Sequence, residues 1–255
     1  MMRWIIEESV FSEESYKKII SCLNKNNIDY SLIRVEPFTY NIDGKIPDNN
    51  GNCILYGSLG IQNVAKKYNY FPGVYTSEDI DESNLIKVFE EEYLNNDAKI
   101  YFLNEVTEND LDEEFFIKPN KDSKEFAGQI LTRDNFSKWL SNLLNIGYLS
   151  DINFEVLVSS PKKIISEWRT IVYEKEIITG SLYRKYGKLY LKEDLPLDLK
   201  RYGENLINKK NFNPTKIYAL DFALTNDGYK VIEINTFNSA SLYECDLNKI
   251  ISILK

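Results

Sequence analysis

The chain has 255 residues, 43% of them hydrophobic and 27% charged, which is ordinary for a globular protein of one compound domain or two to three lobes. Its 39 acidic and 31 basic residues give a net charge of −8, which disfavours a broad nucleic-acid-binding surface but leaves a local basic groove open. The sequence contains no histidine, so Ser-His-Asp and Cys-His catalysis and histidine-ligated metal sites are excluded. Any chemistry must come from carboxylates, lysines, arginines, hydroxyls or a hard metal ion.

The three cysteines, Cys22, Cys53 and Cys245, are scattered and form no CxxC pair. This indicates reduced thiols and argues against a disulfide framework or a zinc site. Residues 1–10 lack the apolar core of a signal peptide, and no apolar run approaches the length of a membrane span. We therefore expect a cytoplasmic protein with no membrane partner.

Strands and helices alternate over roughly the first hundred residues. Strands are expected at 3–7, 30–35 and 53–56, and helices are expected after a Ser12 cap, at 62–68 and at 84–93. This alternation predicts a small α/β lobe.

From Phe115 onward, the pattern predicts longer strands around one amphipathic helix. Strands are expected at 115–119, 153–158, 163–173 and 177–184, with a polar loop at 120–124 and a tight turn at Glu174-Lys175. Asp134 is expected to cap the helix, and its inward side chains are predicted to be Phe136, Trp139, Leu140, Leu143 and Leu144.

Within residues 219–235, two apolar runs flank Asn226-Asp227-Gly228, which predicts a β-hairpin with the glycine in the left-handed position. A three-residue loop then places Asp221 opposite Glu233, with Asn235 on the same face. Carboxylates this close repel one another, and a shared cation is the usual remedy. Oxygen ligands suit a hard ion such as Mg²⁺. The alternative is a solvated strand face whose polar residues bind nothing.

Two cationic residues interrupt expected strands. Lys118 is costly to bury unless an anion pairs with it, so we interpret it as an ammonium directed at a nucleotide phosphate; the alternative is an edge position facing water. Lys124 lies in the polar loop six residues later, which could fold over phosphates. Arg169 is interpreted as a fork for a carboxylate or phosphate, with a surface position as the alternative. Arg184 ends the next expected strand and can reach the same space.

The order of these motifs resembles the ATP-grasp superfamily over about residues 100–245. The matching segments are Phe116-Ile117-Lys118-Pro119, the apolar strand at 154–158, Glu167-Trp168-Arg169, Arg184, Asp221 and Glu233-Ile234-Asn235. The hairpin is the most specific of these segments. The chain is most similar to a little-characterised bacterial and phage branch of amide ligases whose pattern has two lysines and one arginine.

The resemblance implies an α+β fold in which two α+β lobes hold ATP between them, preceded by a small α/β lobe. The implied boundaries are 1–105, 106–158 and 159–255, the last with the hairpin. The implied activity is an ATP- and Mg²⁺-dependent ligase that converts a small-molecule or peptide carboxylate into an acyl phosphate, which an amine then attacks. The alternatives are a nucleotide-binding regulatory or interaction protein and a kinase-like phosphotransferase.

The resemblance also assigns roles by position. Lys118 and Lys124 contact the ATP phosphates, Glu155, Val156, Leu157 and Val158 form the hinge that meets the adenine, and Glu167 lies near the nucleotide. Arg169 and Arg184 are catalytic, and Asp221, Glu233 and Asn235 bind magnesium. One departure is that Gly128 is the only glycine at 120–128, where relatives have a glycine-rich phosphate loop. The first hundred residues and the space near Asn238 are expected to select the substrate.

Overall fold

The computed structural model describes all residues except 1, 9, 78–80, 122–124 and 146–151. The chain divides into two compact units. The first unit comprises Met1–Ser77, Ser166–Phe222 and Ile234–Lys255, and the second comprises Glu78–Ile165 and Ala223–Glu233. The three predicted lobes stay a prediction.

The first sheet of the first unit has the strand order β3-β2-β1-β4-β5. Its strands are β1 (Arg3–Glu7), β2 (Tyr30–Val35), β3 (Ile42–Asp43), β4 (Asn52–Tyr56) and β5 (Phe71–Gly73), and its helices are α1 (Glu13–Lys25) and α2 (Ile61–Lys67). β1 pairs in parallel with both β2 and β4. The Ser12 hydroxyl accepts a hydrogen bond from the Ser15 N–H, which confirms the predicted cap. The α/β character predicted for this segment is confirmed.

The second sheet has the strand order β12-β11-β10-β13-β14. Its strands are β10 (Ser166–Tyr173), β11 (Glu176–Lys185), β12 (Lys188–Glu193), β13 (Ile217–Thr225) and β14 (Gly228–Thr236), with helices α5 (Leu197–Lys209) and α6 (Leu247–Ile253) and the 3₁₀ turn η4 (Phe237–Ser239). Glu174 and Lys175 both have positive φ, as a tight hairpin turn requires, and Gly228 has φ +97°. Both predicted turns are confirmed.

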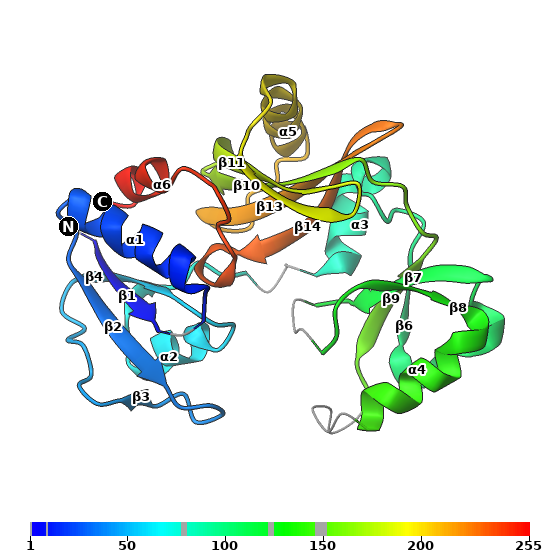
Figure 1. Cartoon of the computed structure of the whole chain (residues 1–255), viewed down its shortest axis with the longest axis horizontal. Helices are drawn as coiled ribbons and strands as arrows, with labels where there is room; N and C mark the ends of the chain where they lie inside the picture. Colours follow the sequence, from blue (N-terminus) through cyan, green and yellow to red (C-terminus); the bar gives the residue numbers. More distant parts are fainter. Residues whose placement is uncertain (1, 9, 78–80, 122–124, 146–151) are drawn as a thin grey trace. The chain divides into compact units, whose positions relative to one another are not determined.

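The second unit contains a four-stranded sheet of order β6-β9-β7-β8. Its strands are β6 (Lys99–Phe102), β7 (Glu114–Pro119), β8 (Gln129–Thr132) and β9 (Glu155–Ser159), with α3 (Glu82–Phe89), α4 (Arg133–Asn145) and the 3₁₀ turns η1 (Glu90–Glu92), η2 (Leu103–Glu105) and η3 (Glu108–Asp110). Helix α4 packs Phe136 and Leu143 into a core that contains Phe115 and Ile117 of β7 (Figure 1).

Two helix predictions in the second unit need correction. Asp134 is not a cap, because α4 begins at Arg133 and Asp134 lies in its first turn, where a carboxylate still favours the positive end of the helix. Leu144 is exposed and does not face inward. Helix α3 begins at Glu82 and ends at Phe89, earlier than the predicted 84–93 at both ends.

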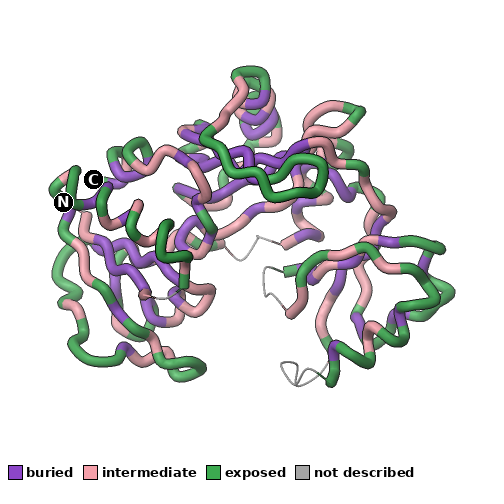
Figure 2. The backbone as a smooth tube through the Cα atoms, viewed as in Figure 1, coloured by how far each residue is buried: buried purple, intermediate pink, exposed green. Residues whose placement is uncertain are grey.

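One hydrophobic core joins both sheets of the first unit. It contains Trp4, Ile6 and Tyr56 from the first sheet and Ile171 and Ile217 from the second. The inner strands are buried along most of their length, whereas the hairpin of β11 and β12 is exposed (Figure 2). The second unit has its own core.

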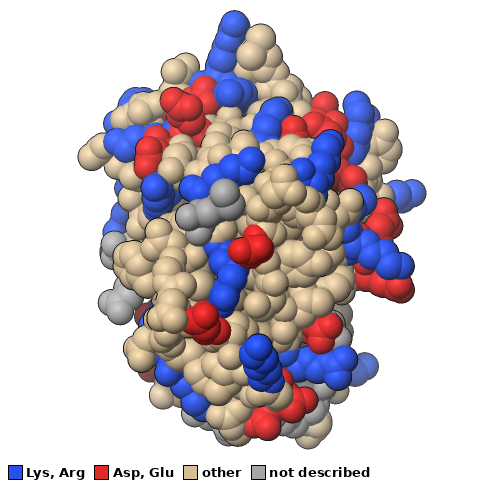
Figure 3. Space-filling view, turned by 90° about the vertical axis from the view of Figure 1, so that its left-hand side faces the viewer, with Lys and Arg blue, Asp and Glu red and all other residues tan. Residues whose placement is uncertain are grey.

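The three cysteines are free and buried, as the sequence predicts. Among the described residues, no helix has the length and apolar character needed to cross a membrane. On the face shown in Figure 3, basic and acidic side chains lie interspersed and do not form a field of one sign.

Candidate functional site

Lys118 occupies an inner strand of the second unit. Its strand, β7, pairs with β8 on one side and β9 on the other. The Nζ atom lies 2.8 Å from Glu82 Oε1 and 3.1 Å from Glu233 Oε2, and only 15% of the side chain is exposed. The alternative of an edge position facing water is therefore wrong. Burial opposes the charge, yet the two carboxylates raise the pKa of Lys118 above its ordinary value, so the ammonium is retained.

Glu82 is a functional residue that the sequence analysis missed. It is the first residue of α3, directly after Asp81, whose side chain caps the helix through the Asn84 N–H. Glu82 is buried, and its Oε2 atom has no hydrogen-bond partner within the described parts of the chain. Loss of solvation raises the pKa of this carboxyl to about 7, against the opposing effect of Lys118. An acidic residue just after an Asp cap was the available signal, but it does not indicate a partner 36 residues away.

A second contact links the start of α3 to β9. The Asn120 side chain is buried, donates a hydrogen bond of 2.7 Å to Glu155 Oε2, and accepts one from the Ser83 N–H. Glu155 is therefore fixed at the end of β9 that lies next to β7. Sequence analysis missed Asn120 because a polar residue after Pro119 is typical of any loop.

The predicted hinge residues all lie in β9. Val156, Leu157 and Val158 pair with β6 on one side and with β7 on the other. The backbone N–H and C=O groups of an inner antiparallel strand bond to its two neighbours. In this structure these groups of the hinge residues are therefore engaged within the sheet, and contact with a base stays a prediction.

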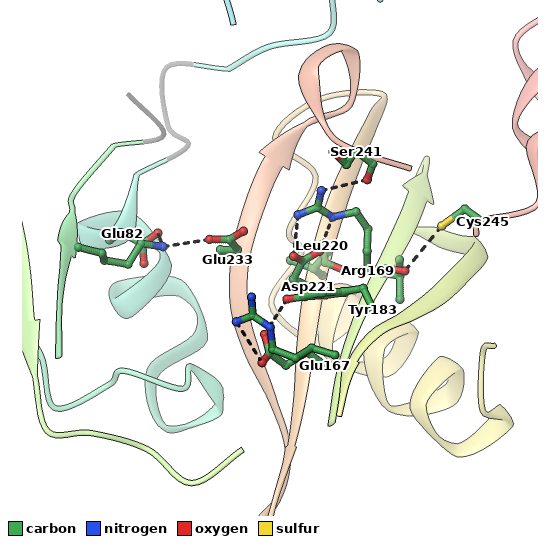
Figure 4. Close-up of polar contacts among 12 residues, drawn as sticks. Glu82, Glu167, Arg169, Tyr183, Leu220, Asp221, Glu233, Ser241 and Cys245 are labelled. Atoms are coloured by element: carbon green, nitrogen blue, oxygen red, sulfur yellow. Dashed lines mark hydrogen bonds and ion pairs between the residues drawn. The ribbon is translucent and has the colours of Figure 1, made fainter. Parts of the chain in front are cut away.

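In the first unit, Arg169 and Asp221 form a buried bidentate pair (Figure 4). The Arg169 Nε atom lies 2.9 Å from Asp221 Oδ1 and Nη2 lies 2.8 Å from Oδ2. Nη1 donates to the backbone carbonyl of Ser241 at 3.0 Å, and the guanidinium lies 5.1 Å from the centroid of the Tyr243 ring. Arg169 is 6% exposed and Asp221 is completely buried, so the surface alternative is wrong. The geometry matches the planar fork that guanidinium offers to a carboxylate.

Glu167 and Arg184 lie opposite one another on β10 and β11. Arg184 Nη1 lies 3.8 Å from Glu167 Oε1, while Glu167 Oε2 accepts a 2.9 Å hydrogen bond from the Tyr183 hydroxyl. Glu167 is buried, but 49% of the Arg184 side chain is exposed. Of the two predicted catalytic arginines, Arg184 is the one open to solvent.

The predicted magnesium ligands have oxygen donors that suit the ion. Glu233 is partly exposed and pairs with Lys118, and Asn235 is half-buried on β14. Asp221 fits less readily, because both of its oxygens accept hydrogen bonds from the cationic Arg169. No group of three or more Asp, Glu, Cys or His arranged for a metal occurs among the described residues. Lys124 lies outside them.

Comparison with known proteins follows from this geometry. The sequence profile of an ATP-grasp domain family, the second family of its clade, matches residues 98–253. No curated protein matches the chain significantly.

Solved structures with similar folds cover nearly the whole chain. D-alanine–D-alanine ligase from Bacillus anthracis is 15% identical with a TM-score of 0.63, over 99% of this chain and 92% of that one. The D-cycloserine synthetase DcsG is 9% identical with a TM-score of 0.63, over 100% of both chains. The ATP-grasp ligase PsnB, complexed with a minimal precursor, is 11% identical with a TM-score of 0.54, over 99% and 98%. At these identities the likeness establishes the fold.

Proposed function

Because this chain belongs to that family of ATP-grasp domains and has the α+β ATP-grasp fold, we propose that it is an ATP- and Mg²⁺-dependent ligase that joins a carboxylate to an amine. Structural relatives include ligases of this kind, one complexed with ATP and another with Mg and ADP. The substrates proposed here are a small-molecule or peptide carboxylate and an amine.

The observation that carries this proposal is the ammonium of Lys118. It is mostly buried, stays protonated, and is held by two carboxylates on a strand that ends in Lys118-Pro119. An ammonium kept in a poorly solvated position is a strong ligand for phosphate oxygens. Lys118 would contact the nucleotide phosphates, with Lys124 as a second proposed contact. Glu155 to Val158 and Glu167 are proposed to lie near the nucleotide.

The proposed reaction has two steps. A substrate carboxylate oxygen attacks the γ-phosphorus of ATP, the bond to the bridging oxygen breaks, and ADP leaves. The amine nitrogen then attacks the acyl carbon, inorganic phosphate leaves with the C–O bonding pair, and the nitrogen loses a proton to phosphate or solvent. Such chemistry depends mainly on positioning and charge neutralisation, which a protein without histidine can supply.

The arginines would take different parts in this reaction. Arg184, half exposed at the end of β11, is proposed to neutralise the phosphoryl group during transfer. Arg169, buried against Asp221 and the Ser241 carbonyl, is proposed to hold these groups in place.

Magnesium would be held by Glu233 and Asn235, with Asp221 as the third proposed ligand. When bound, the ion would neutralise phosphate charge. The variant Glu233→Gln should raise the Mg²⁺ concentration needed for ATP-analogue binding by at least about tenfold, a typical effect of removing one charged contact. Asp221→Asn tests the third ligand, and an unchanged Mg²⁺ requirement would remove Asp221 from the site.

The first test is calorimetric titration with a non-hydrolysable ATP analogue, with and without Mg²⁺. Lys118→Met should weaken binding about 10- to 100-fold, because one charge-assisted hydrogen bond contributes about 1.5–3 kcal/mol. Lys99→Met, on an exposed residue of β6 in the same sheet, is the matched control and should bind like the wild type. No binding of the analogue at millimolar concentration would overturn the proposal.

The second test separates ligation from the two alternatives. Hydroxylamine converts an acyl phosphate into a hydroxamate, so a panel of carboxylic acids with ATP and hydroxylamine should give ADP and hydroxamate together. ADP with a stable phosphorylated product would indicate a phosphotransferase. Nucleotide binding without ADP release across the panel would favour a regulatory protein.

A further inference from the structure

A cavity of ≈310 Å³ lies in the first unit beside the Arg169–Asp221 pair. Two of its lining residues, Ser241 and Tyr243, also contact Arg169, one through its backbone carbonyl and one through its ring. The cavity is therefore separated from Asp221 by a single side chain. Its volume lies at the small end of the range for small-molecule sites, about 300–1,000 Å³, which suits one amino acid better than a larger ligand.

The walls of the cavity are apolar. Phe11 and Tyr56 stack with ring centroids 4.6 Å apart and line one part of it. Leu189 and Leu191 line another part, and both come from one face of the edge strand β12. Leu189 is 72% exposed and Leu191 is 46% exposed. Large aliphatic side chains left open at a cavity gain free energy when an apolar group covers them.

The rim of the cavity is charged. Lys18 lies 2.7 Å from Glu244 and 3.1 Å from Glu14, and all three residues line the cavity. Two carboxylates around one ammonium leave an excess of one negative charge. A cationic group of a ligand, such as an α-ammonium, complements this rim.

We propose that this cavity binds an α-amino acid with a large apolar side chain, with the side chain between the Phe11–Tyr56 stack and β12 and the α-ammonium at the Glu14–Glu244 rim. This inference deepens the proposed function and rests on it for the reaction, although not for binding. The amino acid would be one of the two substrates that the ligase joins, and the apolar walls would set its specificity.

The test is calorimetric titration of the full chain, with the ATP analogue and Mg²⁺ present. The probes are glycine, alanine, leucine and phenylalanine, with the D forms of the last three. Burial of the side chain should make leucine or phenylalanine bind about 10- to 100-fold more tightly than glycine. The ligand 4-methylpentanoic acid, which is leucine without its amino group, should bind at least about tenfold more weakly than leucine, because it loses the charge-assisted contact with the rim.

The matched variants lie on one strand. Leu191→Ser removes apolar surface from the cavity and should weaken leucine binding at least about fivefold. Tyr190→Ser changes the next residue of β12, which does not line the cavity, and should leave leucine binding unchanged. Both positions are exposed, so folding should be preserved in both variants.

Several results would overturn the inference: equal affinity for glycine and leucine, no binding of any amino acid, or an equal loss in the Leu191→Ser and Tyr190→Ser variants. The proposed function fails separately. Leucine binding that Leu191→Ser weakens, without ADP release or hydroxamate, would support the cavity and overturn the ligase. Binding of the ATP analogue with hydroxamate formed only from acids that lack an amino group would support the ligase and overturn the cavity assignment.

Discussion

The variant Glu82→Gln gives the sharpest test of the Lys118 environment. The charged groups that act on Glu82 are Lys118, Glu233 and Asp81, but loss of solvation is the largest effect and raises the pKa from an ordinary 4.5 to about 7. The folded protein thus binds the Glu82 proton more tightly than the unfolded chain. Stability from this group is complete below the unfolded pKa and is lost as the pH rises to about 7.

The magnitude follows from the same values. A rise from 4.5 to about 7, at 1.36 kcal/mol for each pKa unit, corresponds to about 3 kcal/mol. Lys118 does not contribute to this change, because its raised pKa keeps it protonated in the folded state throughout that range. Glutamine retains an oxygen that accepts from Lys118 but cannot ionise. The unfolding free energy of the wild type relative to Glu82→Gln should therefore fall by about 3 kcal/mol between pH 4.5 and pH 8.

Urea denaturation followed by circular dichroism measures this difference at pH 4.5, 6, 7 and 8. Most of the fall should occur below pH 7, with little further change by pH 8. Glu114→Gln serves as the control, because Glu114 is the exposed first residue of the same strand, β7, and its loss should give no comparable trend. A wild-type-minus-variant difference that stays constant within about 0.5 kcal/mol at all four pH values would refute the buried Glu82–Lys118 geometry.

Three further predictions concern the first unit. Arg169→Met should lower the unfolding free energy by about 3–5 kcal/mol in urea at pH 7, because it leaves Asp221 buried without its guanidinium partner. The double variant Arg169→Met/Asp221→Leu should recover much of that loss. Asn238→Ala should cost about 1–3 kcal/mol in the same assay, because this buried amide accepts from the Tyr75 N–H and donates to the Leu55 carbonyl. Burial raises the pKa of Cys245 to about 12, so mass spectrometry should find this thiol unmodified by iodoacetamide at pH 8 until the protein unfolds.

Asn238 also shows how a predicted role changes in the structure. The sequence analysis expected the space around it to select the substrate. The side chain is completely buried and bonds to backbone groups of β4, β5 and Tyr75. Asn238 therefore fixes the segment after β14 to the first sheet, and the residues that follow it, Ser241 to Tyr243, line the cavity.

Local features were accessible from the sequence because neighbouring residues determine them. The Ser12 cap, the turn at Glu174-Lys175 and the left-handed Gly228 depend on a few consecutive residues. Lys118 and Arg169 could be selected as candidates because a charge in an apolar strand is costly without a partner. The expected ATP-grasp fold followed from the order of these motifs, and the family comparison confirms it.

The partners of those charges depended on tertiary structure. Glu82 meets Lys118 across 36 positions, Asp221 meets Arg169 across 52, and Ser241 meets Arg169 across 72. Nothing near Lys118 in the sequence indicates that the first residue of α3 lies beside it, because sheet order and helix packing bring them together. Strand β12 was missed since its six residues are all exposed and lack the alternation of a half-buried strand. Sequence thus determined which residues need a partner, and the fold decided which partner each receives, because ion pairing in a poorly solvated site depends on a distance of a few ångströms that only packing sets.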